Sequence, residues 1–232
     1  MTFDIKLAQR AQGTAQSLVR GSENAEETLS ALGKEATNCA QDSYSASRSA
    51  DEAASDTVAR DSSDLGRRLR HDIGALEDGA KKVANLGDDS HDQMKSLRSG
   101  LDSVVDDLRN LEGQVPSGAA LRDLQEALAS FKDAQIGQPY ALVQDPVDSD
   151  LSRIHSTLED ADSDAHRIAA DDKSDVSRAG SSAHEELTKA RSGFDDISGV
   201  ASHALSIQQD VTLQSRHGLS DLQQFFSDVP RP

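Results

Sequence analysis

The sequence predicts an all-α fold of long antiparallel helical hairpins, packed as an elongated, coiled-coil-like bundle. Apolar residues recur at alternating spacings of three and four between Val58 and Val115, and again between Leu151 and Val229, a pattern that keeps one face of a helix apolar. No segment alternates with the period of two that a half-buried strand shows. Only 35% of residues are hydrophobic and 3% aromatic, which favours thin seams between helices over one large core.

Disorder is the competing interpretation, because the net charge of -17 and the low hydrophobic content are also typical of disordered chains. The periodicity continues over many helical turns, which a disordered chain does not require. We therefore expect a folded helical protein.

The first helix is predicted over residues 2–41. Its interior holds Gly13, Gly21 and Gly33, each of which costs about 1 kcal/mol relative to Ala, so this helix needs a partner. The segment Asp42–Ser49 is rich in short hydroxyl side chains that compete for backbone hydrogen bonds. We predict a turn there, with one continuous helix as the alternative.

The second helix is predicted over Asp51–Leu86, with Gly87 as its C-terminal stop. Ser90 and Gln93 have the spacing of a capping box, which predicts that a third helix starts there. The third helix has the most regular heptads of the chain and is expected to end near Glu112.

A Pro and two Gly residues in Gly113–Gly118 predict a break. A short amphipathic helix is expected over Leu121–Ala134, followed by a linker at Gly137–Pro146, which holds two of the five prolines. The heptads resume at Asp148, fade through the polar gap Asp171–Ser182, and return from Leu187.

These breaks predict three regions: an N-terminal long-helix hairpin region at 1–115, a short helix and Pro-containing linker at 116–147, and a C-terminal helical hairpin at 148–229. The tail from Val229 to Pro232 is expected to be non-helical, because it holds two prolines.

The two halves also share short matches. Arg98–Asp102 resembles Arg191–Asp195, and Ser62–Ser63 resembles Ser181–Ser182. Duplication of a helical unit would explain the matches, and so would chance in a chain rich in Ala, Ser and Asp.

The charge balance argues against nucleic acid as a partner, and hydropathy argues against membrane insertion. Nucleic acid requires a concentrated basic patch, and the clusters Arg67–Arg70 and Lys81–Lys82 are flanked by acids. No window has the length and apolarity of a transmembrane span, so we expect no membrane insertion.

No metal site, cofactor or catalytic centre is predicted. Asp160–Asp164 resembles the start of a calcium loop, but Ala165 and Asp171 stand where the template needs Gly and Glu. No two of the seven histidines have the helical spacing of zinc ligands. We expect the protein not to be an enzyme.

Cys39 is the only cysteine, so no internal disulfide can form, and we expect a small packing residue. The segment Met1–Lys6 lacks the features of a Sec signal peptide. The predicted location is the cytoplasm as synthesised, with export by a non-classical route as the alternative.

A partner-binding face is predicted on the third helix. The flanking stripes Leu18–Ala40 and Leu151–Ile168 are diluted by Ala, Gly and Asp, so the chain's own helices are expected to leave large side chains under-packed. The face comprises Met94, Leu97, Leu101, Val104, Leu108 and Leu111.

The first ninety residues resemble the WxG-type helical-hairpin proteins of type VII secretion. The resemblance lies in a polar start, two helices around a Ser-rich turn, and the sequence Leu65–Ala80 in the second helix. Tyr44–Ala46 stands where that family has Trp-x-Gly, and the family's export signal is absent, because Tyr44 and Tyr140 lack an acid four residues later. The resemblance implies a bacterial, secreted or secretion-associated protein that binds a protein partner.

Two functions are therefore expected. The first is a non-enzymatic helical interaction protein, with association with type VII secretion as its sharper form. The alternative is a coiled-coil scaffold or spacer in a filament, phage or signalling rod, which continuous helices through Ser43 and Ser174 would favour.

Overall fold

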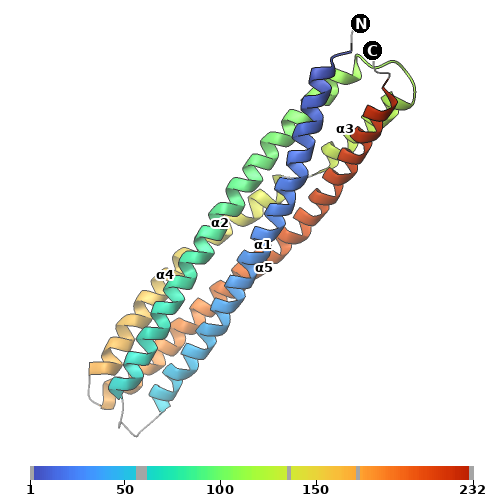
Figure 1. The fold of residues 1–232 in the computed structure, drawn as a ribbon. Helices are drawn as coiled ribbons and strands as arrows, with labels where there is room; N and C mark the ends of the chain where they lie inside the picture. Colours follow the sequence, from blue (N-terminus) through green and yellow to red (C-terminus); the bar gives the residue numbers. More distant parts are fainter. Residues whose placement is uncertain (1–2, 56–61, 135–136, 171–172, 230–232) are drawn as a thin grey trace. The chain divides into compact units, whose positions relative to one another are not determined.

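The computed structural model describes residues 3–55, 62–134, 137–170 and 173–229, and these residues form helices joined by short connections (Figure 1). No strand occurs in these ranges, which confirms the all-α prediction. The helices are α1 (Ile5–Ser55), α2 (Ser62–Glu112), α3 (Ala119–Asp133), α4 (Gly137–Ala170) and α5 (Lys173–Asp228).

The chain divides into two compact units, each assembled from separate stretches of sequence. Unit 1 comprises Met1–Leu29, Asp89–Leu142 and His203–Pro232, and unit 2 comprises Ser30–Asp88 and Val143–Ser202. Helices α1, α2 and α5 contribute to both units, with α3 as the fourth main helix of unit 1 and α4 as that of unit 2. The units are therefore not the contiguous regions 1–115, 116–147 and 148–229 expected from the sequence.

Helix α1 begins at a side-chain cap and continues through the predicted turn. Asp4 Oδ1 accepts hydrogen bonds from the backbone N–H groups of Lys6 and Leu7, each at 3.0 Å, as an N-cap residue does. The prediction of a turn at Asp42–Ser49 is wrong, because α1 continues to Ser55.

Two serines of this segment bond their hydroxyl groups to backbone carbonyls of the same helix. Ser45 Oγ donates to the carbonyl of Gln41 at 3.1 Å, and Ser47 Oγ donates to that of Tyr44 at 2.9 Å. Such local bonds are compatible with helical backbone when tertiary packing favours the helix, and Ser43 and Ala46 are buried here.

Helix α2 likewise continues past the predicted stop at Gly87, so the second and third predicted helices are one. A Cβ at Gly87 would lie 3.2 Å from Val147 Cγ1 on α4. Gly87 therefore allows α2 and α4 to approach closely, and it is not a C-cap. The predicted break at Gly113–Gly118 is confirmed, since α2 ends at Glu112 and α3 begins at Ala119.

The linker expected at Gly137–Pro146 is helical, because α4 begins at Gly137 and contains Pro146. Pro139 lies in the first turn, where a missing N–H has no cost, whereas Pro146 removes one internal hydrogen bond. Most of the polar gap expected at Asp171–Ser182 is helical as well, since α5 begins at Lys173; Asp171 and Asp172 lie outside the described residues.

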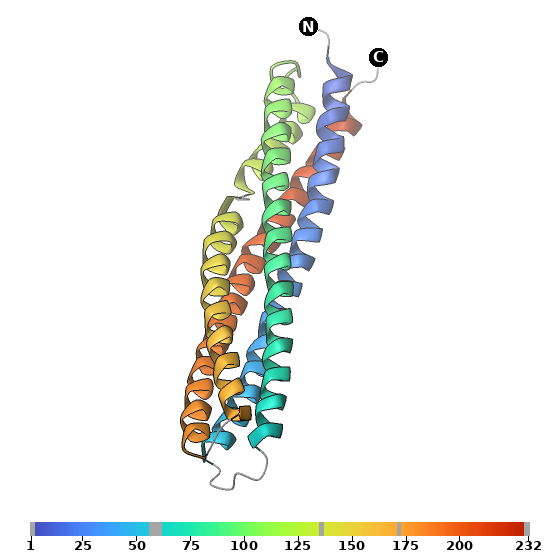
Figure 2. The same cartoon turned by 90° about the vertical axis from the view of Figure 1, so that its left-hand side faces the viewer.

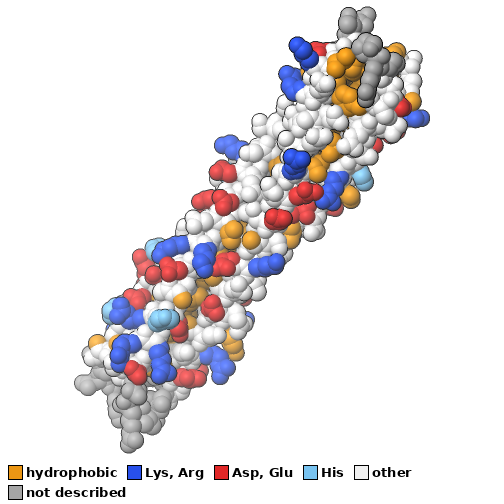
Figure 3. Space-filling view, in the orientation of Figure 1, with side chains coloured by type: hydrophobic (Ala, Val, Ile, Leu, Met, Phe, Trp, Pro, Cys, Tyr) orange, Lys and Arg blue, Asp and Glu red, His pale blue; other side chains and the backbone are white. Residues whose placement is uncertain are grey.

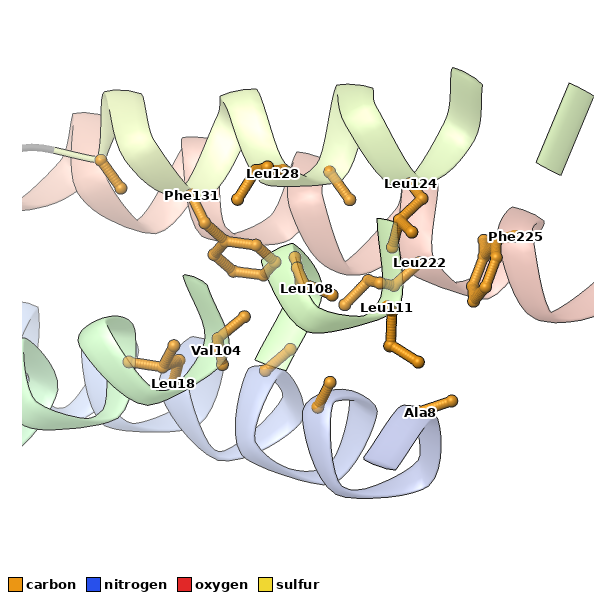
Figure 4. Close-up of a cluster of buried hydrophobic side chains, with 14 of the residues drawn as sticks. Ala8, Leu18, Val104, Leu108, Leu111, Leu124, Leu128, Phe131, Leu222 and Phe225 are labelled. Carbon is orange, nitrogen blue, oxygen red and sulfur yellow. The ribbon is translucent and has the colours of Figure 1, made fainter. Parts of the chain in front are cut away.

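The core of unit 1 joins large side chains from α2, α3 and α5 to alanines and Leu18 from α1 (Figure 4). Helix α1 contributes Ala8, Ala11 and Ala15, all fully buried. The large members are Leu108, Leu111, Leu124, Phe131, Leu222 and Phe225, each 0% exposed. A Cβ at Gly218 would lie 2.7 Å from Phe131 Cε2, so the ring of Phe131 packs directly on the backbone of α5.

In unit 2, segments of α1, α2, α4 and α5 lie side by side (Figure 2). Its buried residues include many alanines besides the larger Leu32, Leu69, Ile73, Ile154 and Phe194. Small residues let helices approach closely, at the expense of apolar area buried per residue.

Replacing Phe131 by Ala should lower the free energy of unfolding by about 3–5 kcal/mol, the usual cost of removing a buried aromatic side chain. Denaturant titration followed by circular dichroism measures this change. Leu213→Ala is the matched control, because Leu213 is 48% exposed. An equal loss in both variants would contradict the packing described for Phe131.

Candidate functional site

The six residues predicted as a partner-binding face lie in unit 1, where five of them are buried. Met94, Leu97, Val104, Leu108 and Leu111 are at most 4% exposed, and Leu101 is half-buried against the same core. The prediction that the chain leaves these side chains under-packed is wrong.

The physical reason is that α3 and the second half of α5 cover this stripe. Leu124, Leu128 and Phe131 of α3 and Leu222 and Phe225 of α5 belong to the same cluster (Figure 4). The sequence argument weighed only the two flanking stripes, Leu18–Ala40 and Leu151–Ile168, and neither supplies these side chains.

One recess in the described part of unit 1 is a groove between α1 and α2 with a volume of about 390 Å³. It is lined by Thr14, Ser17, Leu18, Gly21, Asn24, Asp92, Gln93, Ser96, Leu97 and Gly100. Of the six predicted residues, Leu97 is the one that reaches it. We treat this groove, named the α1–α2 groove, as the candidate functional site.

Two reciprocal contacts form the floor of the α1–α2 groove. A Cβ at Gly21 would lie 2.8 Å from Leu97 Cδ2, and one at Gly100 would lie 3.2 Å from Leu18 Cδ2. Each leucine thus packs on the glycine of the opposite helix, and the small residues around them leave the recess. Ser17 and Gly21, like Ser96 and Gly100, are four residues apart on one helix face, a sequence signal that could have predicted this crossing.

Some polar side chains of the α1–α2 groove already make hydrogen bonds within the protein. Gln93 Nε2 donates to Thr28 Oγ1 at 3.0 Å, and Ser17 Oγ donates to the carbonyl of Gly13 at 3.1 Å. Gln93 Oε1 is buried and accepts no hydrogen bond from the described residues. The accessible part of the groove is therefore an apolar floor bordered by polar side chains, among them the exposed Asn24, Asp92 and Ser96.

A second feature of unit 1 is an acidic cluster between α3 and α5. Asp123 is 7% exposed, and its Oδ2 accepts no hydrogen bond from the described residues. Burial, together with the charges of Glu126 and Asp123, raises the pKa of Asp221, and His217 opposes the rise. Glu126 itself pairs with Arg122 at 3.9 Å.

Another acid, Asp107, is buried and paired. Its side chain is 5% exposed, and Arg10 Nε of α1 donates to its Oδ2 at 2.8 Å. Arg10 Nη2 bonds the second carboxylate oxygen, so the pair is bidentate. This arrangement satisfies a buried charge and ties α1 to α2 within unit 1.

Cys39 and the acids of the calcium-loop-like segment on α4 make packing contacts and ion pairs. Cys39 is buried against Gly79, and burial raises the pKa of its thiol to about 11; the prediction of a packing residue is confirmed. Asp162 pairs with Arg70 and His166, whereas the buried Asp164 pairs with Arg167, so the acids of this α4 segment have separate partners.

His155 and His166 are exposed on α4. His155 pairs with Glu159 at 3.3 Å, one turn later on α4. Within the described ranges, no group of three or more His, Cys, Asp or Glu side chains is arranged to hold a metal ion.

On the face shown in Figure 3, acidic and basic side chains alternate and form no separate fields. None of the helices in the described ranges combines the length and apolarity needed to cross a bilayer. Comparison with protein-family models, curated proteins and solved structures found no match.

Asp221→Asn should stabilise the protein at pH 7. Because the folded state raises the pKa of Asp221 above its ordinary 3.8, the protonated group favours folding, and this contribution is lost as pH rises through the raised pKa. The gain in melting temperature at pH 7 should stay below about 2–4 °C, since solvent screens this half-buried group.

Melting curves at pH 7 and at steps from pH 6 to pH 4 provide the measurement. Asp221→Asn should also weaken the rise in stability on acidification. Asp210→Asn, at an exposed position of α5, is the control, and an identical response of the two variants would show that the cluster has no effect of its own.

Proposed function

We propose that this chain is a non-enzymatic helical interaction protein that binds a protein partner through the α1–α2 groove. The observation that carries the proposal is the groove itself: an open recess of about 390 Å³ with Leu18 and Leu97 in its floor and small residues around them. Small residues allow the backbone of a partner helix to approach, and the leucines supply apolar contact.

The charge of the chain supports a partner with basic residues. The net charge is -17, and the exposed Asp92 lines the groove together with Asn24. Complementary charge speeds association and disfavours acidic competitors. The proposed partner segment is therefore a helix with an apolar stripe and Lys or Arg beside it.

A photo-crosslinking amino acid at Ser96, exposed in the groove, should trap one defined partner from cells of the source organism. The same amino acid at Ser206, an exposed position of α5 outside the groove, should not trap it. A second substitution that fills the groove, Ser17→Trp, should abolish trapping at Ser96 with little change in melting temperature. Equal trapping at both positions would contradict the groove as the binding site.

In its more specific form, the proposal is that the protein is associated with type VII secretion. The support for this form is that α1 and α2 are two consecutive long helices. Tyr44–Ala46, which stands where the family has its turn motif, lies inside α1. Deleting the secretion ATPase in the source organism should remove the protein from the culture medium and leave its intracellular level unchanged. Secretion that continues without the ATPase would refute this finer form.

A scaffold or spacer is the second candidate function. The observation in its favour is the continuity of α1 through Ser43, because long uninterrupted helices suit a spacer. The other expected continuity is not found, since α4 ends at Ala170 and α5 begins at Lys173, just before Ser174. A scaffold would lose function when the unit 2 segments of α1, α2, α4 and α5 are all shortened by equal numbers of heptads, which leaves the α1–α2 groove of unit 1 intact. An interaction protein would tolerate that deletion, so the experiment separates the two candidates.

A further inference from the structure

Two contacts in unit 2 repeat each other. A Cβ at Gly66 of α2 would lie 2.7 Å from the backbone N of Ala169 and 2.8 Å from the carbonyl O of Ala165, both on α4. A Cβ at Gly180 of α5 would lie 2.7 Å from the backbone N of Ala54 and 2.9 Å from the carbonyl O of Ala50, both on α1. In each case a glycine packs on the same two backbone atoms of two alanines one turn apart.

Equivalent residues of the two contacts are separated by nearly the same number of positions along the chain, and we call this spacing the register. Gly180 lies 114 residues after Gly66, and Ala165 and Ala169 lie 115 residues after Ala50 and Ala54. The first contact joins α2 to α4 and the second joins α5 to α1, so the pairing is reciprocal. This is the relation that a two-fold axis produces between two equivalent helical hairpins.

A second pair of glycine contacts, within each hairpin, obeys the same register. Gly79 packs on Cys39, and a Cβ there would lie 2.5 Å from Sγ; Gly193 packs on Ile154, and a Cβ there would lie 2.7 Å from Cγ1. Gly193 lies 114 residues after Gly79, and Ile154 lies 115 residues after Cys39.

Polar contacts between the hairpins of unit 2 repeat as well. Arg70 of α2 donates to Asp162 of α4 at 3.3 Å, and the ring of His184 of α5 contacts the Ser47 carbonyl of α1 at 2.9 Å. His184 lies 114 residues after Arg70, and Asp162 lies 115 residues after Ser47. The side chains differ, but the positions that meet are the same.

In unit 1, buried residues recur at nearly the same spacings. Leu97, Leu108 and Leu111 of α2 match Val211, Leu222 and Phe225 of α5 at a spacing of 114 residues, and all six are buried. Ala8, Ala11 and Ala15 of α1 match Leu124, Ala127 and Phe131 of α3 at a spacing of 116 residues, again all buried.

We infer that the chain is a covalently linked pseudo-dimer, in which one helical hairpin occurs twice and the same packing surface is used by both copies. The partner that this surface fits is a second copy of the hairpin, supplied here by the same chain. The first copy is α1–α2, and the second is α3, α4 and α5, in which the counterpart of α1 is divided into two helices. The matches of Arg98–Asp102 with Arg191–Asp195 and of Ser62–Ser63 with Ser181–Ser182 fall outside this register.

The inference is independent of the proposed partner groove. The glycine contacts that identify the repeat in unit 2, at Gly66, Gly79, Gly180 and Gly193, lie outside the α1–α2 groove.

Reciprocal exchange of the hairpin cores in the full-length chain tests the inference. Residues 32–54 change places with 147–169, and residues 66–87 change places with 180–201. If the copies are equivalent, this exchange rotates the core of unit 2 onto itself and restores every contact described above. We expect cooperative thermal unfolding, with a melting temperature within about 5 °C of the wild-type value.

The matched control shifts one exchanged segment by a single residue, using 67–88 in place of 66–87. That shift turns the buried face by about 100° and should abolish cooperative unfolding. The inference is overturned if the register-matched exchange loses cooperative unfolding as the shifted exchange does.

Single substitutions provide a second measurement that does not depend on refolding an exchanged chain. Gly66→Ala and Gly180→Ala should lower the melting temperature by equal amounts, within about 2 °C, because each Cβ meets equivalent backbone atoms. Gly74→Ala and Gly199→Ala are the controls, since no atom lies within 4 Å of a Cβ at either position, and both should raise the melting temperature. A large loss at only one of positions 66 and 180 also overturns the inference.

Discussion

The close approach of helix backbones at glycine is the constraint on which the packing of unit 2 depends. At Gly66 and Gly180 the neighbouring helix is so near that a Cβ would lie 2.7 Å from a backbone nitrogen. Such contacts fix the register of two helices, because a shift by one residue would place a side chain against backbone that cannot move away. The abundance of buried alanine in this unit has the same origin, since larger side chains would push the helices apart.

The same constraint produces the open recess of unit 1. Gly21 and Gly100 accept the leucines of the opposite helix, and the serines beside them do not fill the space above. Small residues therefore have two effects at one crossing: they allow α1 and α2 to pack closely, and they leave a groove that a partner helix can enter. Packing and binding become linked, because a larger side chain at Gly21 would both displace Leu97 and alter the groove.

Acidic side chains are buried in unit 1 in two different electrostatic environments. Asp107 is buried with a bidentate Arg10 partner, so its charge is compensated. Asp123 is buried without such a partner among the described residues, close to Asp221, whose pKa is raised first by its own burial and then by the charges of Glu126 and Asp123. The contact between α3 and α5 thus carries an electrostatic penalty at neutral pH, which the packing of Phe131 on Gly218 offsets.

By itself, the sequence determined the helical fold, the break at Gly113–Gly118 and the short amphipathic helix predicted over Leu121–Ala134, because periodicity and Pro or Gly clusters act over a few turns. Only the tertiary structure decided that the helices continue through Ser43, Gly87 and Pro146. Local preferences at such positions amount to about 1–3 kcal/mol, and burial against a helix distant in sequence outweighs them. For the same reason the stripe from Met94 to Leu111 turned out to be internal: the residues that cover it belong to α3 and α5, and local periodicity does not say which helices meet.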